Sequence, residues 1–154
     1  MMQRIPLLLL MLILAGTAPL AGQLQVQGIR DLQFGTVMAG VPSQVLPTDP
    51  LRAGEFQFNT RRNSWVLLMF SLPTQLNGPA GATMPIQFGN GDALYVGGHR
   101  NTTPVTFNPQ VWRFMRVDQS GRSWIYLGGQ VNPVPLQRAG SYTNTVTLTV
   151  WVIG

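Results

Sequence analysis

Polar and apolar side chains alternate strictly along the last stretch of the chain, residues 140–154 (GSYTNTVTLTVWVIG). One face of an extended chain would carry the mostly apolar set Tyr142, Asn144, Val146, Leu148, Val150 and Val152. The other face would carry a row of threonines that ends in Trp151 and Ile153. A period of two residues with many β-branched side chains predicts a β-strand. We expect a central or closing strand, with Val146, Leu148, Val150 and Val152 turned toward the core.

Similar short alternating segments recur along the rest of the chain, separated by turn residues. Residues 64–72 (SWVLLMFSL) are apolar on both faces, which predicts a central strand covered on both sides. Residues 89–92 (GNGD) predict a hairpin turn between two strands, residues 73–83 predict a loop, and Gly128-Gly129 predicts a bulge. The other predicted strands are residues 23–29, 31–37, 43–47, 55–59, 84–88, 93–96, 111–117 and 123–127.

The number and spacing of these segments predict the fold class. About eight to ten short strands at intervals of about ten residues are typical of an antiparallel β-sandwich. The composition agrees, because 17 glycines and 12 prolines are spread between short apolar runs and supply the turns that many strands need. Residues 23–154 are long enough for a single domain with its own core.

The N-terminal residues 1–22 have the pattern of a secretory signal peptide. Arg4 supplies the positive charge, residues 5–14 form a nearly continuous apolar run, and small residues follow. We expect cleavage after Ala21 or Gly22, and an uncleaved membrane anchor is the alternative. A signal peptide implies a secreted, periplasmic or cell-surface protein, with membrane contact only before cleavage.

Charge and cysteine content exclude several classes of function. The net charge is +5, but the ten basic residues are scattered arginines, and Arg61-Arg62 is the single adjacent pair. Nucleic-acid binding normally needs a dense basic patch, so we expect no nucleic-acid partner. The chain has no cysteine, which excludes disulfides, cysteine-ligated metals and thiol catalysis.

Catalytic residues are not recognisable in the sequence. His99 is the single histidine and lies in a predicted loop. A Ser-His-Asp triad would need His99 oriented by Asp92 or Asp118, and the chain has no Gly-x-Ser-x-Gly motif. Its acidic residues are isolated, and residues 89–92 lack the repeated acids of a calcium loop. We therefore expect no enzyme, no metal and no cofactor.

Several short motifs occur in an order that resembles a known family. They are Leu32-Gln33-Phe34-Gly35, Glu55-Phe56-Gln57-Phe58, Gly81-Ala82-Thr83-Met84, Leu127-Gly128-Gly129-Gln130-Val131 and Gly140-Ser141-Tyr142-Thr143. Over about residues 30–153 the chain resembles small secreted bacterial β-sandwich proteins of undefined function, which are similar to pilin subunits and spore-coat-type domains. The resemblance implies an immunoglobulin-like or pilin-like sandwich without a catalytic site. The chain differs in lacking a cysteine pair and a long N-terminal extension, which argues against strand donation between subunits.

Aromatic side chains at alternating positions of the late strands form a candidate interaction surface. They are Trp112, Phe114, Trp124, Tyr126 and Trp151. If Ile125 and Leu127 face the core, Trp124 and Tyr126 face away from it. Such an outer face would pack against another subunit, stack on sugar rings, or simply shield the sheet by cross-strand pairing.

These observations favour an exported, non-enzymatic structural subunit of a pilus, fibre or coat. It would associate with itself or with other cell-surface components through sheet edges or through the aromatic face. The candidate edge residues are Leu24 and Val26 in the first segment and Val146, Leu148 and Val150 in the last strand. The alternative is a monomeric carbohydrate-binding or adhesive module that binds a glycan with its aromatic face.

Overall fold

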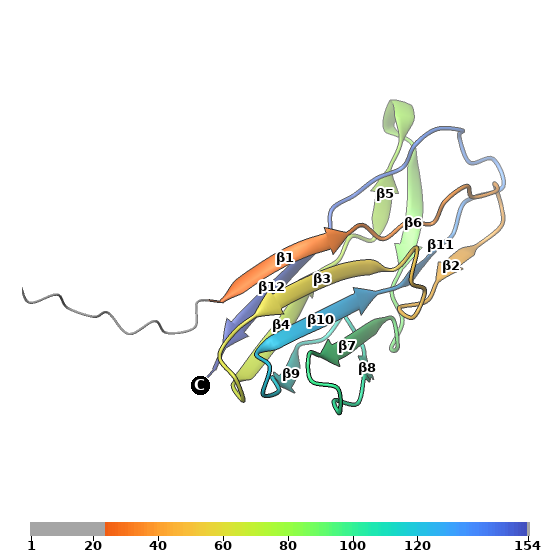
Figure 1. Cartoon of the computed structure of the whole chain (residues 1–154). Coiled ribbons are helices and arrows are strands. Elements are labelled where there is room, and N and C mark those ends of the chain that lie inside the picture. Colours follow the sequence, from red (N-terminus) through yellow and green to blue (C-terminus); the bar gives the residue numbers. More distant parts are fainter. Residues whose placement is uncertain (1–23, 154) are drawn as a thin grey trace, which may run out of the picture.

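The computed structural model describes residues 24–153 and shows an all-β, sandwich-like fold (Figure 1). The predicted signal peptide, residues 1–22, lies outside the described residues. Within them the chain forms twelve strands in three antiparallel sheets and a single 3₁₀ turn, η1 (Pro79–Gly81), with no α-helix. This confirms the all-β class predicted from the alternating pattern.

Five strands form the largest sheet and three form the sheet that faces it. The five-stranded sheet has the order β1 (Gln25–Arg30), β3 (Gly54–Asn59), β10 (Arg122–Leu127), β7 (Ala93–Gly97), β8 (Val105–Phe107). The three-stranded sheet has the order β12 (Thr147–Val152), β4 (Trp65–Ser71), β9 (Arg113–Arg116). A four-stranded sheet at one end has the order β2 (Ser43–Val45), β11 (Gly129–Val131), β6 (Thr83–Gln87), β5 (Gln75–Asn77).

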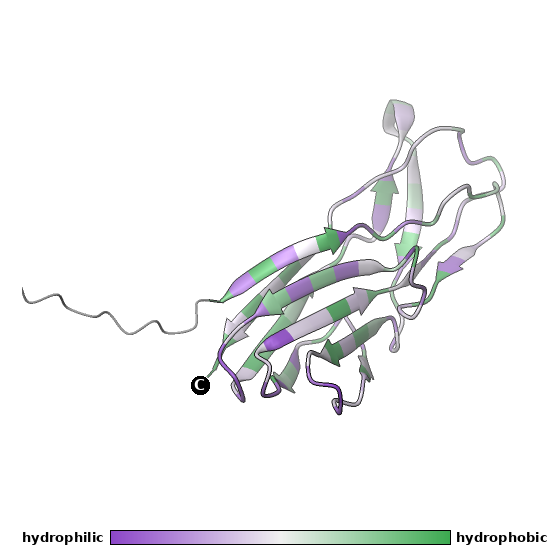
Figure 2. Cartoon of the chain, viewed as in Figure 1, coloured by the Kyte–Doolittle hydropathy of each residue, from purple (hydrophilic) through white to green (hydrophobic). Residues whose placement is uncertain are grey.

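One apolar core joins these sheets. Hydrophobic and polar residues alternate along most strands (Figure 2), so that each strand presents one apolar face. The five-stranded sheet contributes the buried side chains Phe58, Tyr95, Phe107, Ile125 and Leu127. The three-stranded sheet contributes Val66, Leu68, Met115, Leu148 and Val150. Met84, Ile86 and Val131 extend the core into the four-stranded sheet.

Residues 122–131, which we call the shared strand, connect two of the sheets. Their first part, β10, pairs with β3 and β7 in the five-stranded sheet. Their second part, β11, pairs with β2 and β6 in the four-stranded sheet. Gly128 lies between the two parts and donates its N–H to the carbonyl of Asp92 at 2.7 Å. The chain is therefore interrupted at Gly128, where it passes from one sheet to the other, and no register shift of the kind expected for a bulge occurs in its ladders.

Close backbone packing explains why position 128 is a glycine. A Cβ atom there would lie 2.8 Å from the nitrogen of Pro47 and would collide with the carbonyl oxygen of Val45. Both are backbone atoms, so no side-chain rotation relieves the contact. The absence of a side chain at Gly128 lets the chain before β3 cross over the shared strand.

The last strand is shorter than expected and lies at an edge. β12 begins at Thr147 and is an edge strand of the three-stranded sheet, which agrees with its assignment as a candidate edge and excludes a central position. Leu148 and Val150 are buried as predicted, but Val152 is 42% exposed because it lies at the end of the sandwich. Residues 140–146 make only one bridge, between Asn77 at the end of β5 and Thr143.

The central strand β4 is placed as predicted between β12 and β9, but the prediction that both its faces are covered is wrong. Val66 and Leu68 are buried, whereas Trp65 is 50% exposed. No layer of the described structure covers the outer face of this sheet. An apolar run therefore predicted the centre of a sheet correctly without revealing that its second face stays open.

Three loop and strand assignments also change. Residues 31–37 form no strand, because Gly35 has a φ of +69°, outside the β region. Residues 73–83, expected to be a loop, contain β5 and η1. Residues 89–92 do turn the chain, but β6 and β7 do not pair with each other, since both lie along the shared strand. The extra strands β5, β8 and β11 have only three residues each, too few for a recognisable period.

Replacing Gly128 with alanine should destabilise the protein by about 1–3 kcal/mol, the usual cost of overpacking. The added methyl group would push apart the shared strand and residues 45–47. The free energy of unfolding in urea measures this change. Gly91→Ala is the matched control, since a Cβ atom at Gly91 meets nothing within 4 Å. Equal stability of the two variants would contradict this account of Gly128.

Candidate functional site

An open groove of about 1070 Å³ lies between two segments of the described chain. One wall consists of residues 28–39, which include the end of β1, and the other wall consists of residues 137–146, which precede β12. The floor is apolar and comes from the five-stranded and four-stranded sheets: Phe56, Leu76, Met84, Ile86, Leu127 and Val131. The groove thus opens into the hydrophobic core.

Both walls lack the backbone pairing of a strand. Within residues 31–37, Gln33 donates to the carbonyl of Arg52 at 2.9 Å, and no ladder follows. Within residues 140–146, Thr143 and Asn77 exchange two hydrogen bonds of 2.8 and 2.9 Å. Leu32, Phe34 and Val146 nevertheless pack against the core. The two segments combine a strand-like sequence with an almost complete absence of strand partners.

Side-chain hydrogen bonds hold the second wall to the β5–β6 hairpin. The Tyr142 hydroxyl donates to the carbonyl of Arg138 and accepts from Gln137 Nε2, both at 2.7 Å. Gln137 Nε2 also donates to the carbonyl of Thr83 at 3.0 Å. The Tyr142 ring occupies the space where a Cβ atom of Gly78 would lie. This wall is therefore positioned without a β-ladder.

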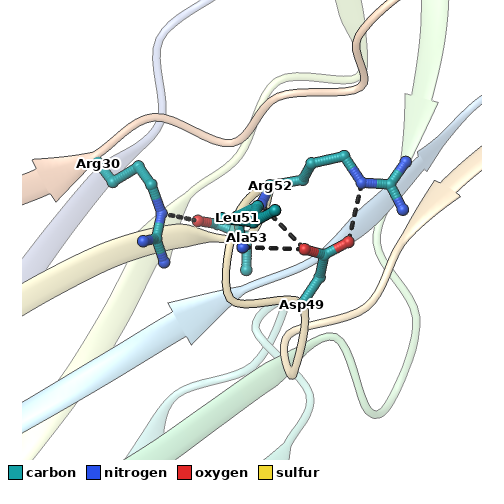
Figure 3. A network of polar contacts seen from close by, with 5 residues as sticks. All are labelled: Arg30, Asp49, Leu51, Arg52 and Ala53. Carbon is teal, nitrogen blue, oxygen red and sulfur yellow. Dashed lines mark hydrogen bonds and ion pairs between the residues drawn. The ribbon is translucent and has the colours of Figure 1, made fainter.

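Polar contacts of Arg30 and Asp49 fix the end of β1 and the chain before β3 (Figure 3). Arg30 Nε donates to the carbonyl of Ala53 at 2.9 Å, and its Nη2 lies 3.2 Å from Glu55 Oε2. Asp49 accepts from the backbone nitrogens of Leu51 and Arg52, both at 3.0 Å, and from Arg52 Nε at 2.8 Å. The hydrogen bond from the Leu51 N–H, followed by the one from the Arg52 side chain, lowers the pKa of Asp49. The groove therefore borders on a fixed part of the chain.

The predicted edge residues lie on two strands at open sheet edges. β1 pairs only with β3, and β12 pairs only with β4, within the described residues. Leu24 is half-buried and Val26 is 38% exposed. Leu148 and Val150 point into the core, and Val146 lines the groove. The side chains of Leu148 and Val150 are therefore not available to a partner. A strand added to the β12 edge would pair with the backbone of these residues.

The predicted aromatic surface is divided between two sheets. Trp124 and Tyr126 lie on the outer face of the five-stranded sheet, because Ile125 and Leu127 face the core as expected. Trp112, Phe114 and Trp151 belong to the three-stranded side, and the rings of Trp112 and Trp151 lie 6.4 Å apart. The five residues therefore do not form one surface.

Trp65 adds a ring that the sequence analysis did not select. Its position at the start of an apolar run suggested a covered residue, yet it shares the outer face of the three-stranded sheet. In this sheet Leu67 is paired with both Phe114 and Trp151, while Trp65 is opposite Arg116. The exposed aromatic side chains here, which we call the aromatic face, are Trp65 (50%), Trp112 (64%), Phe114 (59%) and Trp151 (42%).

His99 and Asp118 are close, but not in the arrangement of a catalytic triad. The Asp118 carboxylate accepts from the backbone nitrogen of His99 at 2.8 Å, not from its ring. It also accepts from Thr102 Oγ1 at 2.7 Å and from the Ser120 nitrogen and hydroxyl at 2.8 and 2.5 Å. Asp92 accepts from the Gly89 nitrogen. Both carboxylates therefore hold loops in place.

These contacts determine the ionisation of Asp118. Burial raises the pKa of Asp118, but the hydrogen bonds from Ser120, His99 and Thr102 outweigh burial and lower the pKa to about 2.

Among residues 24–153, no group of three or more histidine and acidic side chains is arranged to hold a metal ion.

The stability of the protein should fall as the pH drops from about 4 to about 2. The folded state holds the Asp118 pKa below its ordinary value of 3.8, so this stabilisation is complete above that value and is lost on protonation. Urea unfolding at several pH values measures the effect. Asp118→Asn should lose less stability over this interval than the wild type. An identical acid dependence in the two proteins would contradict the role of Asp118.

Comparison with protein-family models, curated proteins and solved structures found no match to this chain. In the part of the chain that the structure describes, no helix is long and apolar enough to cross a membrane. The groove and the aromatic face are therefore interpreted from their own geometry.

Proposed function

We propose that the protein is an exported, non-enzymatic structural subunit that assembles with other copies of itself through the groove. A second copy supplies the missing strand partner of residues 31–37 and 140–146. The observation that carries this proposal is the coincidence of an apolar floor with two strand-like walls that lack a ladder. Export is the consequence of the predicted signal peptide.

The chemistry of the groove favours an extended polypeptide as its occupant. Open sheet edges offer unpaired N–H and C=O groups, and an added strand satisfies them. Alternate side chains of that strand would point to the floor formed by Phe56, Leu76 and Leu127 and remove apolar surface from water. Backbone pairing supplies affinity, and the floor selects apolar side chains at alternate positions.

We also propose that the fold is an immunoglobulin-like or pilin-like sandwich with one incomplete side. The five-stranded and three-stranded sheets end at β1 and β12, and the groove lies beyond these strands. The described N-terminal strand does not act as a free donor, since β1 is paired with β3 from Gln25 to Arg30. The second copy therefore adds to a sheet that already contains its own first strand.

A charge on the groove floor should prevent assembly. Leu76→Asp places a carboxylate where the second copy would bury it, which costs about 3 kcal/mol or more. We expect the self-association constant to fall at least about 100-fold, measured by sedimentation of the mature protein. Leu136→Asp is the matched control, because Leu136 is 95% exposed and lies outside the groove lining.

Hydrogen exchange gives a second readout that does not depend on a variant. The backbone amides of residues 31–37 and 140–146 should exchange quickly in the monomer and slowly in the assembly, since an added strand would bond them. A wild-type protein that remains monomeric at high concentration would contradict the proposal. So would assemblies in which these amides stay unprotected.

A further inference from the structure

A second cavity of about 300 Å³ is lined mainly by polar residues, and we call it the polar cavity. Three connections meet there: the β3–β4 turn, the loop after β7 and the β9–β10 turn. These connections lie at the opposite end of the sandwich from the β5–β6 hairpin (Figure 1). The backbone N–H of Asn63 donates to the carbonyl of Asp118 at 3.2 Å, and the backbone N–H of Thr60 donates to the carbonyl of Gly121 at 2.9 Å. The polar side chains that line the cavity include Asn63, His99, Asn101, Thr102, Arg116 and Gln119.

Arg116 connects this polar cavity with the aromatic face. It lines the cavity and is directly opposite Trp65 in the β4–β9 ladder. Opposite residues of an antiparallel pair point to the same side of the sheet, so the guanidinium and the indole share one surface. The next pair along the same face is Phe114 and Leu67. Aromatic rings and hydrogen-bonding groups therefore adjoin one another.

The charge at this end is strongly positive. Its exposed arginines are Arg61, Arg62, Arg100, Arg116 and Arg122. The ion pairs of the described residues involve Arg30 and Arg52 instead. The one carboxylate of the polar cavity, Asp118, already accepts four hydrogen bonds from the protein. The arginines are thus available to an anionic partner.

We propose that the aromatic face and the polar cavity together bind an acidic polysaccharide. A sugar ring stacks on Trp65, and a carboxylate of the same chain pairs with the Arg116 guanidinium. Hydroxyl groups of the sugar exchange hydrogen bonds with the amides of Asn63, Asn101 and Gln119. This site is independent of the groove and does not rest on the proposed assembly.

Two other occupants of the aromatic face fit the observations less well. A second copy would bring its own arginine cluster against this one, and like charges at an interface are repulsive. An anionic membrane would match the charge, but Thr147 and Thr149 share this side of the sheet with Trp151. Their hydroxyls would lose water in hydrocarbon without gaining a partner, whereas a sugar offers hydrogen bonds.

Binding to polygalacturonate tests the proposal, with neutral dextran as the comparison polymer. The mature protein should bind polygalacturonate and not dextran in isothermal titration or affinity electrophoresis. Trp65→Ala and Arg116→Gln should each weaken binding about tenfold or more, because each removes a stacking or charge-assisted contact. Trp124→Ala and Arg52→Gln are matched controls outside both the site and the groove lining and should bind as the wild type does.

Several results would overturn the inference. They are no binding of polygalacturonate by the wild type, equal binding by all variants, or an equal loss in the two controls. Binding of anionic lipid vesicles that depends on Trp65 while polygalacturonate is not bound would assign the face to a membrane. Self-association that Trp65→Ala abolishes would assign it to a second copy. Thermal melting verifies that each variant is folded. Arg116→Gln alters only an exposed side chain, so this variant still tests the inference if Trp65→Ala unfolds.

Discussion

The close contact at Gly128 is the constraint on which the arrangement of the sheets depends. One strand, residues 122–131, provides the neighbours of β3 and β7 and then those of β2 and β6. The backbone of residues 45–47 lies where a side chain at position 128 would be. Only a glycine at this position lets the strand pass from one sheet to the other without a collision. The core therefore continues from the sandwich into the four-stranded end, and the floor of the groove draws on both parts.

The groove results from strands that end before the apolar surface beneath them does. β1 stops at Arg30 and β12 begins at Thr147, while Met84, Ile86 and Val131 extend the core beyond them. The intervening segments cover this extension only partly and make few backbone hydrogen bonds. Apolar surface exposed to water is unfavourable, and an added strand would cover this surface while pairing the open backbone groups beside it.

The groove and the polar cavity lie at opposite ends of the molecule and differ in chemistry. The groove has an apolar floor and walls whose backbone is mostly unpaired, which suits a polypeptide. The polar cavity is lined by amides and an arginine beside exposed indoles, which suits an acidic sugar polymer. An assembly formed through the groove would leave the polar cavity open, so a surface array could carry one polysaccharide site in each subunit.

The sequence by itself determined the all-β class, the burial of Leu148, Val150, Ile125 and Leu127, and the central place of β4, because a period of two residues records which side of a strand meets the core. The tertiary structure alone decided which strands pair. It decided between a central and an edge position for β12, left residues 31–37 unpaired, and separated β6 from β7. It also divided the aromatic residues between two sheets and added Trp65 and Arg116 to one of them. The reason is physical: alternation is local, whereas pairing and coverage depend on segments distant in the sequence.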